Sequence, residues 1–263
     1  MLETAANPYA AELGDKATAA SRLNLAQSFN GLGCILAPVI VGGFLFSGDN
    51  GNVAVPYTIM GIIVLCVAFM FTRVDLPEIA TPDNENKENE SSKAANGTIA
   101  AIRHLWSNRT FRFGVLALFF YEVAEISINS LFINYATTDG WMSKSTASIV
   151  LSFGALGLFM IARVFGSWIM SRIAAEKVLF FCALMTIVGS LAVTLNAGHL
   201  SHAGVFVCYA FEAIMFPTIF AITISRAGRH VKIASSFLMM TPIGGAVGTF
   251  LMGYTADITS MST

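Results

Sequence analysis

Two carboxyl groups stand three residues apart inside a strongly apolar stretch of this sequence. The segment FFYEVAEISIN, residues 119–129, carries Glu122 and Glu125 among aromatic and branched aliphatic residues. Two close carboxyl groups in a low-dielectric environment rarely both ionise, so we expect one of them to hold a proton near neutral pH. Such a pair can take up and release a proton, or it can form hydrogen bonds with the hydroxyl groups of a ligand.

Two more carboxyl groups lie in similar surroundings. Glu212 stands in YAFEAIMFPTIF and Glu3 in MLETAANPY. Four such groups facing lipid would cost about 10 kcal/mol on insertion scales, so they must face a bundle interior or a watery cavity, or be protonated. A neutral acid bonded to a neighbouring helix is the alternative for any one of them. Helical periodicity predicts one cavity-lining face, formed by Leu118, Glu122, Glu125 and Asn129.

Amide side chains gather in an earlier apolar stretch, LNLAQSFNGLGCILAPVIVGG. Asn24, Gln27 and Asn30 fall on one broad helical face. Amides donate and accept hydrogen bonds at once, which suits an uncharged ligand with many hydroxyl groups. Buried amides also hold helices together, so both roles remain open for each of these residues.

The elements that must position these groups are long apolar helices. The chain of 263 residues is 55% hydrophobic and only 12% charged, and its mean hydropathy is +0.68. A water-soluble domain carries about twice that charged fraction. We therefore predict an all-α polytopic membrane protein, because a backbone that faces lipid must form its hydrogen bonds within a helix. Seven complete spans are expected, at 23–47, 54–72, 112–136, 146–170, 177–197, 203–225 and 234–254.

The basic residues predict the orientation of these spans. Thirteen Lys and Arg residues fall in one set of loops, and Lys144 alone falls in the alternating set, while Arg163 lies inside a span. Positive loops stay in the cytoplasm, so the long loop 73–111 is expected on the cytoplasmic side of the inner membrane. We expect its acidic first part to be disordered and residues 98–112 to form an amphipathic helix on the membrane surface.

These features predict a division of the chain at the long loop. Residues 1–72 are interpreted as the end of an N-terminal bundle, with a partial helix at 1–12 and two spans, and residues 112–263 as a C-terminal bundle of five spans. The polar start suggests a span that begins upstream, so we expect a fragment. Pro217 and Pro242 are predicted to interrupt helices, and Gly244 and Gly248 have the spacing of a close helix contact.

Several classes of function find no support in the residues. The four cysteines have no paired spacing, so neither a disulfide framework nor a metal site is indicated. Nothing resembles a nucleotide-binding loop, and we expect no cofactor, no metal and no nucleic-acid partner. An intramembrane enzyme, such as a lipid-linked glycosyl transferase, is disfavoured because the external loops are short and hold few candidate groups.

The motifs ETAANPY and RLNLAQSFNGLG, followed by FGVLALFFY, ARVFGSWIMSR, FPTIFAITI and SSFLMMTPIGGAVGTFLMG, resemble the fucose:proton symporter family of the major facilitator superfamily. That family includes fucose, glucose/galactose and N-acetylglucosamine carriers. The resemblance implies two six-helix bundles around a cavity that opens alternately to each side. This chain would run from within the fourth helix to the end of the eleventh, and it would work as a monomer in membrane lipid.

The resemblance also implies roles for single residues. The family's glutamate for proton coupling falls on Glu3 and its sugar-contacting asparagine on Asn30. Gln27 joins them by its place on the same face, while Glu122, Glu125, Asn129 and Glu212 are candidates for sugar binding, with Glu122 and Glu125 also candidates for proton coupling. The function expected is import of a monosaccharide by proton symport. The alternatives are a sodium-coupled sugar carrier and a truncated remnant without function.

Overall fold

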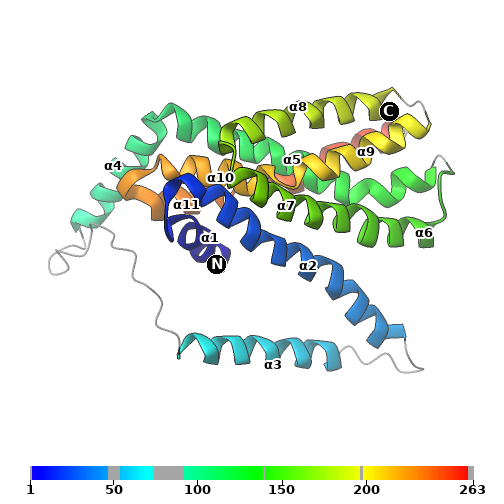
Figure 1. Ribbon diagram of the computed structural model, residues 1–263, viewed down its shortest axis with the longest axis horizontal. Coiled ribbons are helices and arrows are strands. Elements are labelled where there is room, and N and C mark those ends of the chain that lie inside the picture. The colour runs from blue at the N-terminus through cyan, green and yellow to red at the C-terminus, as the bar shows by residue number, and fades with distance from the viewer. Residues whose placement is uncertain (1, 47–53, 74–91, 139, 196–197, 260–263) are drawn as a thin grey trace.

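The computed structural model describes residues 2–46, 54–73, 92–138, 140–195 and 198–259 (Figure 1). Its elements are helices, as the composition predicts. They are α1 (Leu2–Glu12), α2 (Ala19–Phe46), α3 (Ala54–Phe71), α4 (Ser92–Ser107), α5 (Arg109–Thr138), α6 (Lys144–Ile149), α7 (Leu156–Met170), α8 (Ala175–Thr194), α9 (His199–Glu212), α10 (Met215–Ser225), α11 (Val231–Leu238) and α12 (Ile243–Ile258). A π-helical segment, Val150–Ala155, joins α6 to α7.

Five helical segments within the described residues are long and apolar enough to cross a membrane. They are Arg109–Thr138, Lys144–Met170, Ala175–Thr194, His199–Ser225 and Val231–Ile258. These five confirm the last five predicted spans, with boundaries shifted by a few residues. The two earlier predicted spans form α2 and α3, which are helical as expected. That α2 and α3 cross the membrane stays a prediction.

Both predicted proline interruptions are present. α9 ends at Glu212, five residues before Pro217, and α10 follows after a short bend. α11 ends at Leu238, and Pro242 is the N-cap residue of α12. Proline lacks the backbone N–H that would continue the helix and clashes with the preceding turn. Each interrupted segment nevertheless remains long enough to cross a bilayer.

The loop residues at one end of the bundle carry positive charge. Lys16 precedes α2, Arg172 follows α7 and Arg226 follows α10. We call this end, formed by residues 13–18, 171–174 and 226–230, the basic end. Asn108, just before α5, donates from Nδ2 to the Arg226 carbonyl at 3.4 Å, which places the start of α5 there as well. That this end faces the cytoplasm stays a prediction.

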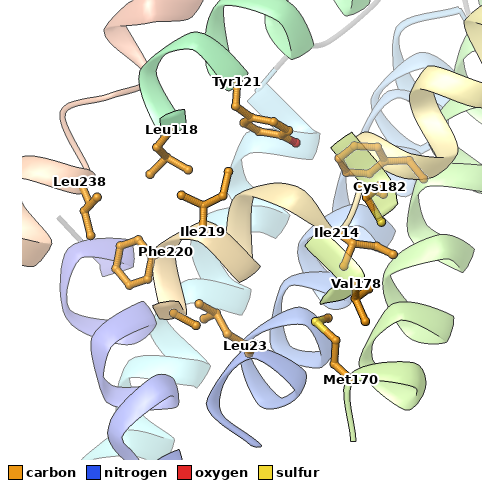
Figure 2. Close-up of a cluster of buried hydrophobic side chains, with 14 of the residues drawn as sticks. Leu23, Leu118, Tyr121, Met170, Val178, Cys182, Ile214, Ile219, Phe220 and Leu238 are labelled. Carbon is orange, nitrogen blue, oxygen red and sulfur yellow. The ribbon is translucent and has the colours of Figure 1, made fainter. Parts of the chain in front are cut away.

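An apolar core forms where α2, α5, α7, α8, α10 and α11 meet (Figure 2). Leu23, Leu118, Phe220 and Leu238 are fully buried in it. Tyr121 also lies in this core and brings a phenol into otherwise apolar surroundings. By contrast, α3 lies apart from most of the other helices in Figure 1, and its apolar side chains are exposed at residues 57–71.

The glycines on α12 allow close packing against α5, as their spacing predicts. A Cβ atom at Gly244 would lie 2.6 Å from the Phe119 carbonyl oxygen, and one at Gly248 would lie 2.6 Å from the Val123 carbonyl oxygen. No side chain fits at such distances, so the two backbones approach more closely than larger residues would permit.

The predicted surface helix differs from α4 at both ends. α4 begins at Ser92, before the expected start at residue 98, so the stretch that we expected to be disordered is helical from there. α4 stops at Ser107 because Asn108 begins a new helix, its Oδ1 accepting from Thr110 N at 3.0 Å. The rest of the expected disordered stretch, residues 74–91, lies outside the described residues. Leu105 is 1% exposed, so part of the expected membrane-facing stripe packs on protein instead.

Candidate functional site

The bend between α9 and α10 provides two backbone acceptors inside the bundle. Pro217 has no N–H with which to bond the Ala213 carbonyl, four positions earlier. Arg163 on α7 uses that carbonyl instead, donating from Nε at 2.9 Å. The neighbouring Glu212 carbonyl accepts from Tyr121 Oη on α5 at 3.0 Å. Hydrogen bonds from α5 and α7 therefore hold the interrupted helix at the bend between α9 and α10.

Arg163 is the charged group at the centre of these contacts, and it is 5% exposed. Besides the bond to Ala213, its Nη1 donates to the carbonyl of Gln27 on α2 at 2.9 Å. Its guanidinium also lies over the Phe159 ring, 4.5 Å from the centroid. Because Gln27 belongs to α2 and Ala213 to the C-terminal helices, this one side chain joins the two parts of the chain.

Sequence reasoning placed Arg163 inside a span and gave it no role. The signal that could have found it is the cost of a guanidinium at membrane depth, which marks such a residue as a candidate site. Its acceptors could not be found in the sequence, because both are backbone carbonyls.

Two carboxyl groups lie within electrostatic reach of each other, and one of them, Glu125, also lies within electrostatic reach of Arg163. Glu125 interacts with the charge of Arg163 and with that of Glu212. The phenols of Tyr121 and Tyr209 lie in the field of both carboxyl groups. Glu212 is 3% exposed, whereas Glu125 is only partly buried. A positive charge beside one member of a pair of interacting carboxyl groups can balance that carboxylate, and the other carboxyl group can remain protonated.

The predicted partnership of Glu122 with Glu125 accounts for only part of this geometry. Glu122 is 6% exposed on the same helix, but the charges of Arg163 and Glu212 reach Glu125 from α7 and α9. Leu118 is fully buried in the apolar core, so the predicted cavity-lining face does not extend to it. The roles of Glu122, Glu125 and Glu212 in binding a sugar stay predictions.

A chain of amides runs from the C-terminal helices to α2. Asn7 on α1 donates from Nδ2 to Met239 Sδ at 3.9 Å and accepts from Gln27 Nε2 at 2.8 Å. Asn30 Nδ2 in turn donates to Gln27 Oε1 at 3.4 Å. Asn7 and Gln27 are buried and Asn30 is exposed, so the chain ends in an accessible amide that is bonded to Gln27.

Asn7 is a residue that sequence reasoning missed, although the motif ETAANPY contains it. Two other predicted site residues are Glu3 and Asn129. Glu3 lies on α1, but its side chain is outside the described residues. The Asn129 Oδ1 atom is buried and has no hydrogen-bond partner in the structure, which identifies a polar group that a ligand or a water molecule could satisfy.

Further contacts close the basic end between the N-terminal and C-terminal helices. Ser21 on α2 and Ser167 on α7 each donate a hydroxyl to the other's carbonyl, both at 2.8 Å. Asn24 Nδ2 donates to Thr218 Oγ1 at 3.1 Å, and Asn24 is fully buried. The Asn24 Nδ2 atom thus joins two helices, while its Oδ1 atom is buried without a hydrogen-bond partner in the structure. We name these contacts, together with Gln27–Arg163, the seam.

Metal binding has no candidate in the part of the chain that the structure describes, since no group of three His, Cys, Asp or Glu residues is placed to hold an ion there. The groups available for chemistry are carboxyls, amides, phenols and one guanidinium. This set can bind hydroxyl groups and can exchange protons.

Known transporters are similar to this chain in sequence and in the arrangement of their helices. The L-fucose-proton symporter of Escherichia coli (strain K12) is 32% identical over 281 residues, covering 97% of this chain and 62% of its own length. A glucose/galactose transporter of Brucella abortus is 30% identical, covering 98% of this chain and again 62% of its own length. The chain thus spans somewhat less than two thirds of these relatives. Both are transporters by name, as expected, and not enzymes.

The fold also has solved counterparts. A crystal structure of the E. coli fucose:proton symporter superposes with a TM-score of 0.86 at 31% identity, covering 99% of this chain and 69% of that one. A structure of a major facilitator superfamily transporter in the outward conformation gives a TM-score of 0.84 at 32% identity, covering 99% and 68%. The family model of the Major Facilitator Superfamily matches residues 1–259. The chain therefore belongs to the major facilitator superfamily.

Proposed function

We propose that the protein is a secondary active transporter that imports a monosaccharide by proton symport with alternating access. The sugar would belong to the fucose, glucose/galactose or N-acetylhexosamine class. This proposal extends to the chain what the relatives' names say of them. The observation that carries it is the cluster of Glu125, Arg163 and Glu212 inside the helical bundle, in which Arg163 and Glu212 are buried and Glu125 is partly buried.

The cluster supports proton coupling because the net charge of its three side chains can change by one without leaving a buried ion that has no partner. With one carboxyl ionised, Arg163 is balanced, and protonation of that carboxyl leaves a guanidinium that still has two carbonyl acceptors. Proton-relay groups in transporters are buried acids of this kind. Glu3, at the position of the family's coupling glutamate, and Glu122 are the other acids that we propose for this role.

The amide chain supports recognition of an uncharged polyol. Asn30 offers a donor and an acceptor at an accessible position, and it is bonded to Gln27, which is bonded to Asn7. Each hydroxyl of a sugar both donates and accepts, so an amide can satisfy it in two directions. Asn129, with its buried acceptor, is the proposed contact on the C-terminal side.

We further propose that the basic end faces the cytoplasm and that the described state is closed there. The seam at Ser21–Ser167 and Asn24–Thr218 supports the closure, and one similar structure is of an outward conformation. The Lys and Arg distribution supports the orientation. The long loop 73–111 would then lie in the cytoplasm and separate two helical bundles.

Uptake of labelled sugars by the purified protein in proteoliposomes tests the function. With an inward proton gradient, one sugar of the panel is expected to accumulate, and a protonophore should abolish that accumulation. Protein-free liposomes are the control. Accumulation that ignores the protonophore but follows an imposed sodium gradient would replace proton coupling with sodium coupling. No uptake of any sugar would contradict the proposed transport itself.

A further inference from the structure

Arg163 differs from the other groups of the site because its bonds reach both sides of the seam. Its Nε bond to Ala213 lies within the C-terminal helices, whereas its Nη1 bond to Gln27 crosses to α2. If the basic end opens, α2 must separate from α7 and the second bond must break. The first bond can persist, because α7 and the α9–α10 bend belong to the same group of helices.

A guanidinium that loses one partner at membrane depth needs another, since an unpaired buried charge is strongly unfavourable. Glu125 meets that need. It lies on α5, which belongs to the same C-terminal helices as Arg163, and the two side chains already interact electrostatically. Tyr121 on its own helix and Glu212 and Tyr209 on α9 also interact electrostatically with Glu125.

We propose that Arg163 is a latch that exchanges partners: it holds the basic end shut through the Gln27 carbonyl, and when that end opens it pairs with Glu125, whose proton then leaves to water on the basic side. The O–H bond of the Glu125 carboxyl breaks, a hydrated proton forms, and an arginine–carboxylate pair replaces the bond to Gln27. This inference rests on the proposed symport and names Arg163 as the positioning residue that links opening to proton release.

The latch is tested without any substrate by the accessibility of a buried reporter. Ala20, next to Ser21 at the seam, is 5% exposed, so an Ala20→Cys variant with the native cysteines replaced should react slowly with a maleimide. Arg163→Gln removes the charged donor. Loss of a charge-assisted hydrogen bond should shift the closed-to-open ratio by about 10- to 100-fold, and alkylation should accelerate accordingly. Arg163→Lys, which can bond only one of the two carbonyls well, should give an intermediate rate.

The matched control is Arg172→Gln in the same Ala20→Cys background. Arg172 follows the end of α7, is exposed, and lies over the Trp168 ring at 4.3 Å rather than across the seam. Its loss should leave the alkylation rate of the introduced cysteine unchanged. An alkylation rate that is the same in Arg163→Gln, Arg163→Lys and the parent would overturn the latch. Because no sugar is involved, this result does not depend on whether transport is detected.

The exchange with Glu125 has a separate readout. Glu125→Gln cannot release a proton, so we expect the ratio of gradient-driven accumulation to sugar exchange at equal pH to fall at least about tenfold relative to the parent. If Glu125→Gln still accumulates sugar on a proton gradient, Glu125 is not the group that receives Arg163. If the parent protein transports no sugar, the symport proposal fails, while the alkylation experiment still decides on the latch.

Discussion

The contact between α12 and α5 allows a prediction in which two identical substitutions differ only in their surroundings. Gly248 and Gly253 lie on the same helix, α12. A Cβ atom at Gly248 would stand 2.6 Å from both the Val123 carbonyl oxygen and Ser127 Oγ, whereas one at Gly253 would meet nothing within 4 Å. Gly248→Ala and Gly253→Ala therefore make the same change in helix propensity. Only Gly248→Ala places its new methyl group against atoms of α5.

The magnitudes follow from two opposing effects. Replacing a helical glycine by alanine favours the helix by about 0.5–1 kcal/mol, which is the whole effect expected at Gly253. At Gly248 the two helices must move apart, because a backbone carbonyl cannot yield as a side-chain tip can, and overpacking of this kind costs about 1–3 kcal/mol. The two variants should thus differ by about 1–3 kcal/mol in their stability, since the gain in helix propensity is common to both.

Thermal unfolding of the purified protein in detergent, followed by tryptophan fluorescence, measures this difference. With about 2–4 °C per kcal/mol for a chain of this size, the apparent Tm of Gly248→Ala should lie about 2–12 °C below that of Gly253→Ala at equal heating rate. Equal Tm values for the two variants, at or above that of the parent, would refute the close approach of α12 to α5. A fall in both by the same amount would show instead that α12 is sensitive to alanine at any position.

Three further predictions concern the polar centre. Pro217→Ala restores a backbone N–H that competes with Arg163 for the Ala213 carbonyl, so the maximum uptake rate should fall about tenfold at unchanged KM; initial rates over a range of sugar concentrations decide this, and an unchanged maximum rate would contradict it. Tyr121→Phe leaves the Glu212 carbonyl without its donor and should cost about 1–3 kcal/mol, seen as a lower apparent Tm that Tyr254→Phe, at an exposed site, does not share. Asn7→Ala removes the acceptor of Gln27 and should raise the KM for the transported sugar about tenfold; an unaltered KM would separate the amide chain from recognition.

The helices could be predicted from the sequence because their signals are local. Long apolar runs marked the last five spans, Pro217 and Pro242 marked the interruptions, and Gly244 and Gly248 marked the close contact with α5. Each of these signals acts within a few residues of its own position. The boundaries of α4 were predicted less well, because the cap at Asn108 competes with an otherwise continuous amphipathic pattern.

The site could be predicted only in part because its partners are distant in the sequence. Periodicity placed Glu122, Glu125 and Asn129 on one helix, but the charges that act on Glu125 come from α7 and α9. The bond between Arg163 and Gln27 joins residues 136 positions apart. Its acceptor is a main-chain carbonyl, which every residue possesses, so no residue type in the sequence could mark it.

The bend at Pro217 has a backbone acceptor without a helical donor, and the buried Arg163 has donors that need acceptors. A proline inside a membrane helix leaves a carbonyl without its helical donor, which is costly where no water can replace it. A guanidinium at the same depth needs acceptors for its N–H groups. The bond from Arg163 Nε to the Ala213 carbonyl satisfies both requirements. Since that bond stays within the C-terminal helices, the remaining donors of Arg163 are available to bond α2 in the described state and, in the latch that we propose, a carboxylate when the basic end opens.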